Sequence, residues 1–246
     1  MHRTPPTHPF TARLVVLLAA LALPSLALAQ DGAASLPDDA DSDAVVLRVG
    51  ERERTLAQFA DRFEIAIRGA AAQQGLPLTD ETRPRFEALA PQFLEQRGQQ
   101  LALLELADAR GIDPSEAEVD ALVAEVRADA GTEEFEQLLA ASGIGSEATL
   151  RTLLAESARI GQLRDEVAAT VEVGEDDVRA AYDEAAAAQD LPPYGEVRSQ
   201  LEAGLVRQEV QARLGELLAG VEIEAFPDRL PYAAAPAAPP VPPQAP

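Results

Sequence analysis

Histidine, cysteine and lysine are missing from residue 30 to the end of this chain. His2 and His8 are the only histidines, all 20 basic residues are arginine, and the cysteine count is zero. The usual general base at neutral pH, the thiolate nucleophile, the Schiff-base amine and the nitrogen and sulfur metal ligands are therefore absent there. The composition favours binding through surface shape over catalysis.

The first 29 residues have the pattern of an export signal. Arg3 and Arg13 accompany an apolar run at 14–23, Pro24 ends that run, and Ala27-Leu28-Ala29 offers small residues where a signal peptidase cleaves. A membrane anchor is the weaker alternative, because a span needs about 20 apolar residues and proline breaks helices. We expect a signal peptide at 1–29, export by the general secretory route, and a soluble protein in the periplasm or another extracytoplasmic space.

Acidic residues far outnumber basic ones. Without the export signal, 18 of the 20 arginines face 42 acidic residues, which gives a formal charge of about −24. Nucleic acids and anionic lipids bind basic surfaces. We therefore expect no nucleic-acid partner and no stable insertion into a membrane.

The remainder divides into three segments. Residues 30–43 are acidic, small and turn-rich, which predicts a disordered leader. Residues 231–246 form an alanine- and proline-rich stretch without a periodic apolar face, which predicts an extended, mobile tail. Residues 44–230 lie between them and have room for one domain or two small ones.

The interior of 44–230 is mostly helical by pattern, with apolar residues at helical spacing behind capping residues. The predicted helices begin near Thr55, Thr79 or Asp80, Ser115, Ser146, Gly174 and Tyr194, with a short helix around Phe135. Pro91 is expected to kink or divide the second one. Only 44–49 and 221–226 look extended. One extended segment at each end suggests that the two strands pair, because a two-strand unit by itself is weak. The C-terminal segment is then expected to close onto the N-terminal half. The fold class is thus mainly α with a small terminal β-sheet.

The last predicted helix, 194–220, carries two opposed apolar stripes. Val197, Leu201 and Leu205 lie on one side, and Val206, Val210, Leu214, Leu217 and Val221 lie roughly opposite. Such a helix contacts one body with its first half and another with its second half. It is expected to pack back on the N-terminal half of the domain. Exchange of this helix between two copies, and hence self-association through it, is a second interpretation.

Three stretches follow one another in an order seen in a known family. Residues 49–59 contain Val-Gly, then Thr-Leu and a phenylalanine; 101–119 is a leucine-rich helix followed by Gly-Ile and a capped Glu-Val helix; 171–184 reads Val-Glu-Val-Gly-Glu-Asp-Asp-Val and ends with a tyrosine helix. In this order they resemble the chaperone portion of SurA/PrsA-type periplasmic foldases, the SurA N-terminal domain family. The resemblance covers most of 44–226.

The chain departs from that family after Tyr182. In the foldases the tyrosine helix leads into a parvulin-type prolyl isomerase domain, and the chain returns through a Pro-(Phe/Tyr)-x-x-Val helix. Residues 193–197, Pro-Tyr-Gly-Glu-Val, resemble this return, yet only the nine residues 183–191 precede Pro192. Nine residues cannot hold a domain. The resemblance therefore implies the chaperone portion without the isomerase, and no enzyme.

We therefore predict an exported, ATP-independent chaperone (a holdase) that binds unfolded or partly folded secreted or outer-membrane polypeptides through apolar helix faces. The sequence contains no nucleotide-binding glycine motif, and no cofactor or metal is expected. The candidate client-contacting residues are Phe59, Phe63, Phe86, Phe93, Phe135, Leu139 and Tyr182. Core packing is the favoured role for each of them, since apolar stripes at helical spacing usually form cores.

Two alternatives belong to other functional classes. One is a secreted helical adaptor or assembly protein with one specific partner. The other is an enzyme that uses a carboxylate pair such as Asp176/Asp177 or Glu133/Glu134. Adjacent residues on a helix point about 100° apart, and acidic residues at a helix start are explained by the helix dipole. The enzyme is therefore the weakest interpretation.

Overall fold

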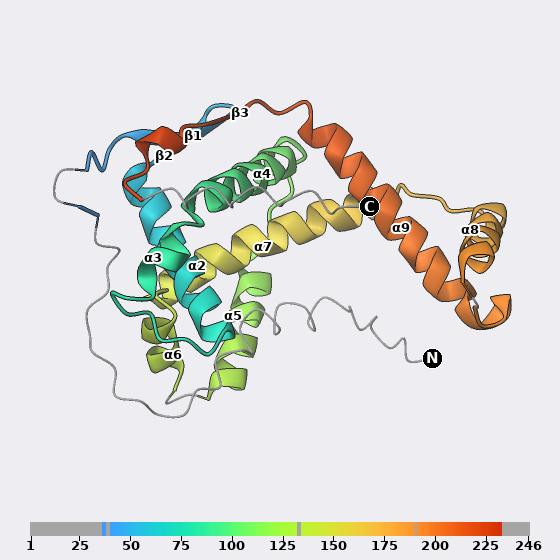
Figure 1. Ribbon diagram of the computed structural model, residues 1–246, viewed down its shortest axis with the longest axis horizontal. Helices are drawn as coiled ribbons and strands as arrows, with labels where there is room; N and C mark the ends of the chain where they lie inside the picture. The colour runs from blue at the N-terminus through green and yellow to red at the C-terminus, as the bar shows by residue number, and fades with distance from the viewer. Residues whose placement is uncertain (1–35, 38–39, 132–133, 190, 233–246) are drawn as a thin grey trace, which may run out of the picture.

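The computed structural model describes residues 36–37, 40–131, 134–189 and 191–232 (Figure 1). The predicted export signal, Glu133 and all of the predicted tail beyond Tyr232 lie outside these residues. The helices are α2 (Leu56–Gln73), α3 (Arg83–Glu87), α4 (Ala90–Ala109), α5 (Glu116–Ala130), α6 (Phe135–Ala141), α7 (Glu147–Ala168), α8 (Glu175–Ala188) and α9 (Tyr194–Leu218). The strands are β1 (Val45–Val49), β2 (Arg52–Thr55) and β3 (Ile223–Ala225). The mainly helical class with a small sheet is confirmed.

The sheet joins the two ends of the described chain in the strand order β2-β1-β3, with both neighbours of β1 antiparallel to it. Pairing of the two predicted strands is thus confirmed. Strand β2 was not predicted, because Arg52–Thr55 is polar throughout and has no apolar alternation. Gly50 makes the tight turn into it with a φ of 55°, a left-handed conformation that glycine adopts without strain.

Local sequence signals place the helix ends. Thr55 and Ser115 begin α2 and α5 with capping boxes, and the Ser146 side chain accepts a hydrogen bond from the Thr149 backbone at 3.2 Å at the start of α7. The predicted break near Pro91 is confirmed: α3 ends at Glu87, α4 begins at Ala90, and Pro91 lies in its first turn. Proline is tolerated there because the first-turn N–H has no partner within the helix.

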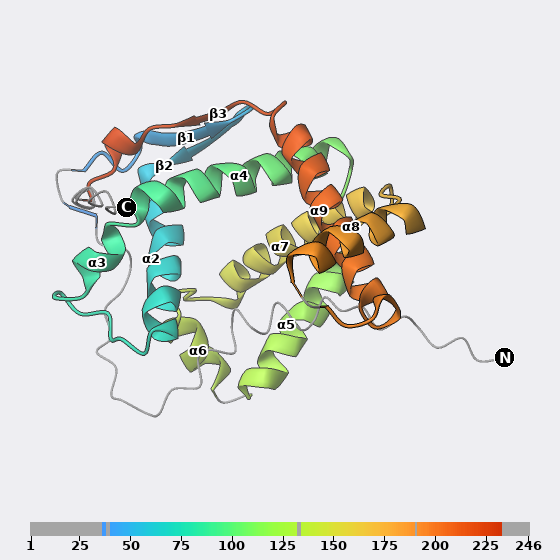
Figure 2. The ribbon, with the colours of Figure 1, turned by 45° about the vertical axis from the view of Figure 1, so that its right-hand side comes forward.

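The sheet lies along α4 (Figure 2), and one glycine permits the close approach. A Cβ on Gly98 of α4 would lie 2.9 Å from Ile223 Cγ2 and 3.3 Å from Leu47 Cδ1. The main core lies where β1, α2, α3 and α4 meet, and a second core joins α5, α6 and the start of α7.

Helix α9 has two different environments along its length. Its second half packs on the body of the protein, where Leu214 is buried against Ala107 of α4 and Leu163 and Val167 of α7. Its first half packs against α8, and together they project from the body (Figure 1). We call α8 and residues 194–205 the arm. The two contact bodies predicted from the opposed stripes are confirmed.

Residues of both the predicted leader and the predicted tail pack against the domain in the structure. Leu36 and Ala40 pack against the main core, and Ala57 N donates to Ser42 O at 3.0 Å, so the described part of the leader is attached to the domain. At the other end, Tyr232 also packs against the main core. The boundaries predicted at 43/44 and 230/231 are therefore corrected, because apolar side chains on both flanks find partners in the core.

Candidate functional site

Five of the seven predicted client-contacting side chains are interior. Phe59 and Phe63 of α2 and Phe86 of α3 are at most 3% exposed in the main core. Phe135 and Leu139 of α6 are each 1% exposed in the second core. Each lies on the face of its helix that packs against a neighbouring element. Core packing, the role that the sequence favours for these residues, is what the structure shows for all five in this arrangement, and client contact stays a prediction.

Phe93 is half-buried and lies at the edge of the main core, where part of its ring is exposed. Its ring centroid lies 5.6 Å from that of Phe59 and 5.3 Å from that of Phe63, and the last two are 5.5 Å apart. Such distances are typical of favourable aromatic pairs. We call these three rings the aromatic surface; two helices, α2 and α4, position it.

A fourth ring, Tyr232, covers the aromatic surface. Its centroid lies 5.1 Å from that of Phe63 and 6.4 Å from that of Phe59. Burial, reinforced by the negative charges of Glu87 and Glu64, raises the pKa of the Tyr232 phenol to about 12. Sequence analysis missed this residue because it stands among alanines and prolines with no periodic spacing. Its only signal is an isolated aromatic two residues after Leu230.

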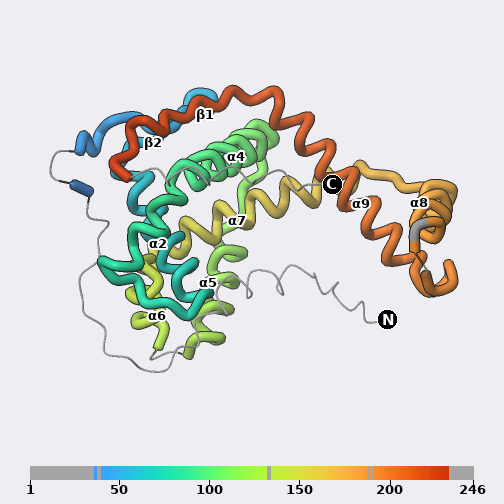
Figure 3. Tube along the Cα trace, viewed as in Figure 1, coloured from blue at the N-terminus to red at the C-terminus, as the bar shows by residue number. Residues whose placement is uncertain are grey.

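Residues 226–232, which we call the closing segment, return along the N-terminal strands after β3 (Figure 3). Phe226 N donates to Val46 O at 2.9 Å, and Pro227–Arg229 then form a single 3₁₀ turn. The Arg229 guanidinium lies 4.1 Å above the Phe226 ring and donates to Val45 O. From Pro227 onward, side chains and not a strand ladder attach the segment.

The closing segment borders a shallow surface pocket. This pocket of about 390 Å³ is lined by Ala40, Asp41, Ala44 and Leu56 and by residues 228–231. The pocket is open to solvent, so residues 228–231 lie at the surface and only part of the segment is enclosed by protein.

A buried carboxylate fixes the edge of this site. Glu64 of α2 accepts hydrogen bonds from Arg68 Nε at 2.7 Å and from the Arg83 guanidinium at 2.8 and 3.2 Å. Burial alone would raise the pKa of Glu64, but hydrogen bonds and charge from Arg83 and Arg68 outweigh it and hold the pKa below its ordinary value. Glu64 thus stays ionised and ties α3 to α2.

A second charged cluster lies inside the body between α2, α4 and α7. Glu156 of α7 receives Arg62 of α2 at 3.1 Å and Arg97 of α4 at 3.2 Å. Arg97 is 7% exposed, and Arg62 Nη1 is buried with no hydrogen-bond partner. Burial lowers the pKa of Arg62, while the Glu156 charge opposes that shift. These groups hold three helices together.

The arm carries the remaining predicted residue. Tyr182 is half-buried, and its ring meets Tyr194 edge-on at 5.3 Å while its hydroxyl donates to Pro192 O at 3.1 Å. Glu175 receives Tyr194 Oη at 2.7 Å and Arg198 Nη2 at 2.7 Å, and the hydrogen bonds from Arg198 and Tyr194 lower its pKa. Apolar residues of the first half of α9 stay half-exposed: Val197, Leu201, Leu205 and Val206.

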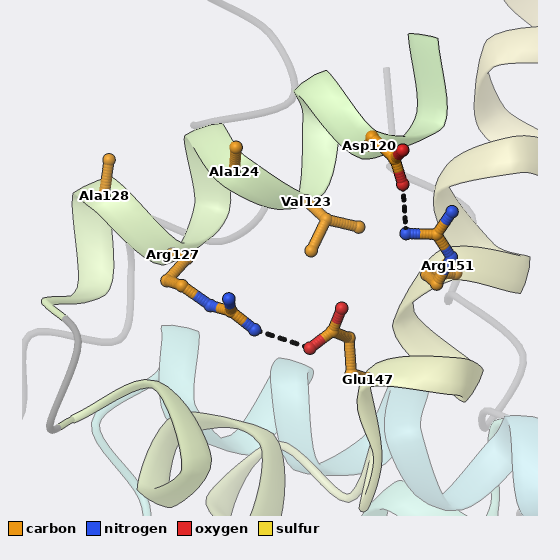
Figure 4. A pocket seen from close by; sticks show the side chains of 7 residues that line it. All are labelled: Asp120, Val123, Ala124, Arg127, Ala128, Glu147 and Arg151. Carbon is orange, nitrogen blue, oxygen red and sulfur yellow. Dashed lines mark hydrogen bonds and ion pairs between the residues drawn. The ribbon is translucent and has the colours of Figure 1, made fainter. Parts of the chain in front are cut away.

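A shallow pocket of about 400 Å³ lies between α5 and α7 (Figure 4). Arg151 pairs with Asp120 at 2.6 Å and Arg127 pairs with Glu147, so each charged side chain in its wall has an opposite partner. The Arg127 guanidinium also lies 4.6 Å from the centre of the Phe135 ring. With its carboxylates paired, the pocket offers no acid–base constellation.

Within the described ranges, no group of three or more His, Cys, Asp and Glu side chains is placed to hold a metal ion. Asp176 and Asp177 are exposed at the start of α8, where the Asp177 carboxylate accepts the Gly174 N–H at 3.0 Å. None of the helices in the described part of the chain is long and apolar enough to cross a membrane.

Comparison with known proteins assigns no family to this chain. No family model matches the chain, and no curated protein matches it either. The resemblance to SurA-type foldases therefore stays a prediction from the sequence.

Proposed function

We propose that this protein is an exported, ATP-independent holdase that binds unfolded polypeptides on the aromatic surface. One observation carries the proposal: Phe59 and Phe63, which pack beside Phe93, hold Tyr232 of an irregular stretch of chain, the closing segment, by ring packing. Apolar burial has no directional requirement. A surface that holds its own irregular segment in this way suits many unrelated segments of unfolded chain.

The charge of the protein supports the same function. The formal charge, −22 for the whole chain and about −24 without the predicted export signal, keeps loaded complexes apart by mutual repulsion. Helix α8 ends at Ala188 and α9 begins at Tyr194, so the two helices of the arm follow each other closely. This connection favours a chaperone that works without an inserted isomerase domain.

The test is an aggregation assay with a chemically unfolded, exported client, diluted without nucleotide into buffer that contains the protein. We expect light scattering to fall strongly at a stoichiometric ratio. Phe93→Ser should weaken this protection several-fold, because Phe93 is the accessible ring of the surface. Leu138→Ser is the matched control, since Leu138 is also half-buried but belongs to the second core.

Unchanged aggregation in the presence of the wild-type protein would reject the holdase. A parallel assay of prolyl-peptide isomerisation should give only the uncatalysed rate. Turnover well above that rate would instead favour an isomerase.

The arm favours a second candidate, a helical adaptor with one folded partner. Three apolar residues of α9, Val197, Leu201 and Leu205, are half-exposed on the arm, which projects from the body. An adaptor would bind one partner tightly and saturably, and Leu201→Asp would abolish that binding. A holdase would protect several unrelated clients, and this change in the arm would affect protection less than Phe93→Ser does.

A further inference from the structure

We propose that the closing segment is a built-in competitor of the client: Tyr232 and Leu230 occupy the client site, and a client binds by displacing them. This inference rests on the proposed holdase function and adds to it a regulation of the same site. It follows from three features of the segment, namely what it covers, how it is attached and what it resembles chemically.

Tyr232 covers the part of the surface that a client would use. Its ring lies against Phe63 and Phe59 at 5.1 and 6.4 Å, and both of those side chains are at most 3% exposed with Tyr232 in place. Phe93, the third ring, is half-buried beside them. Withdrawal of Tyr232 would uncover apolar area at the position where the proposed holdase binds its client.

The attachment of the segment is suited to reversible release. After the hydrogen bond from Phe226 to Val46, the segment is held by the packing of Leu230 and Tyr232 and by the Arg229 side chain. An open surface pocket of about 390 Å³ borders residues 228–231, so this part of the segment faces solvent on one side. Local openings of lowest free energy occur where buried apolar contacts are few.

The segment also indicates what a client segment must offer. In an extended chain, residues two apart lie on the same side. Leu230 and Tyr232 are both half-buried against the core, whereas Pro231 between them is exposed. The fitting client is therefore an extended stretch with a large aliphatic and an aromatic side chain two residues apart. Because the closing segment is tethered, it competes at a high effective concentration and raises the apparent Kd of any client.

The experiment measures binding of a fluorescent peptide with the sequence of residues 226–232 to the full chain by anisotropy. Tyr232→Ser removes the competing ring, and we expect this variant to bind the peptide about tenfold more tightly than the wild type, the effect of a segment that occupies the site about nine-tenths of the time. Tyr232→Phe keeps the ring, and its affinity should equal that of the wild type. A peptide with serine at its last position should bind neither protein well.

A second variant guards against a folding defect in Tyr232→Ser. Arg229→Gln removes the bond to Val45 O and leaves both apolar side chains unchanged. It should tighten peptide binding in the same direction but less. Equal affinity of the wild type, Tyr232→Ser and Arg229→Gln for the peptide would overturn the inference, and so would failure of all three to bind it.

The proposed function and this inference fail in different assays. If the wild type does not suppress aggregation but Tyr232→Ser binds the peptide more tightly, the holdase is rejected and the covered site stands. If the wild type suppresses aggregation and Tyr232→Ser protects clients no better, the holdase stands and the competition is rejected. Better protection by Tyr232→Ser than by the wild type supports both.

Discussion

Replacing Glu64 with glutamine tests how α2 and α3 are held together beside the aromatic surface. The Glu64 side chain is 6% exposed and receives two arginines, Arg68 from its own helix and Arg83 from α3. Glutamine keeps the size of the side chain and one accepting oxygen but removes the charge. Any loss of stability therefore measures the electrostatic part of this contact.

The burial of Glu64 and of its two arginine partners sets the size of the expected loss in stability. Removing one partner of a buried ion pair costs about 3–5 kcal/mol, because the other charge stays buried and unpaired. Here the arginine side chains are 22% and 33% exposed and regain water, while the amide still accepts one hydrogen bond. We therefore expect Glu64→Gln to lower the free energy of unfolding by about 2 kcal/mol at pH 7.

The loss should depend on pH in a definite direction. The pKa of Glu64 is lowered from its ordinary value of 4.5, so its ionised form stabilises the folded state. That contribution is complete above the unfolded pKa and is lost as the pH falls through the lower folded pKa. The difference between wild type and Glu64→Gln should stay constant from pH 7 to pH 5.5 and shrink as the pH falls below 4.5.

Urea unfolding followed by circular dichroism at several pH values measures this difference. Glu209→Gln is the control, because Glu209 pairs with Arg213 on the exposed side of α9, with the two side chains 48% and 39% exposed. That change should stay within about 0.5 kcal/mol at every pH. A Glu64→Gln loss below about 1 kcal/mol at pH 7, or one that persists undiminished at low pH, would refute the argument.

Three further predictions concern other parts of the molecule. Glu156→Gln should cost about 3 kcal/mol in urea unfolding, because it leaves Arg97 and Arg62 buried with no carboxylate; a loss below about 1 kcal/mol would contradict this. Leu214→Ala should cost about 2–4 kcal/mol and speed hydrogen exchange in α9 more than in α4, since Leu214 is the buried anchor of α9 on the body; equal acceleration in both helices would argue against that anchor. In an absorbance titration of the three tyrosines, one ionisation should occur near pH 12, and this step should be missing in Tyr232→Phe. Because the pKa of Tyr232 is raised in the folded state, its contribution to stability is complete below pH 10 and is lost between pH 10 and 12.

Most of the helical framework follows from neighbours in the sequence. Thr55, Ser115 and Ser146 cap their own helices within three residues, and Pro91 separates α3 from α4 by its missing N–H. The opposed stripes of α9 follow from helical periodicity and correctly predicted two contact bodies. These features are short-range, so the chain alone determines them.

The candidate site needed the tertiary structure. Periodicity identified Phe59, Phe63 and Phe93 as apolar stripe residues, but it does not distinguish an interior ring from one at the surface. Strand β2 is polar and exists because β1 pairs with it, and the Arg97–Glu156 pair joins residues 59 positions apart.

The absence of histidine, cysteine and lysine beyond residue 29 is a property of the sequence alone, and it directed the interpretation toward binding. Where binding occurs is decided by the return of the C-terminal chain. Tyr232 lies 169 positions from Phe63 in the sequence, yet their rings are 5.1 Å apart. Local propensity carries no information about contacts at such a separation. They form because β3 pairs with β1 and brings the residues that follow it over a surface whose apolar area water disfavours.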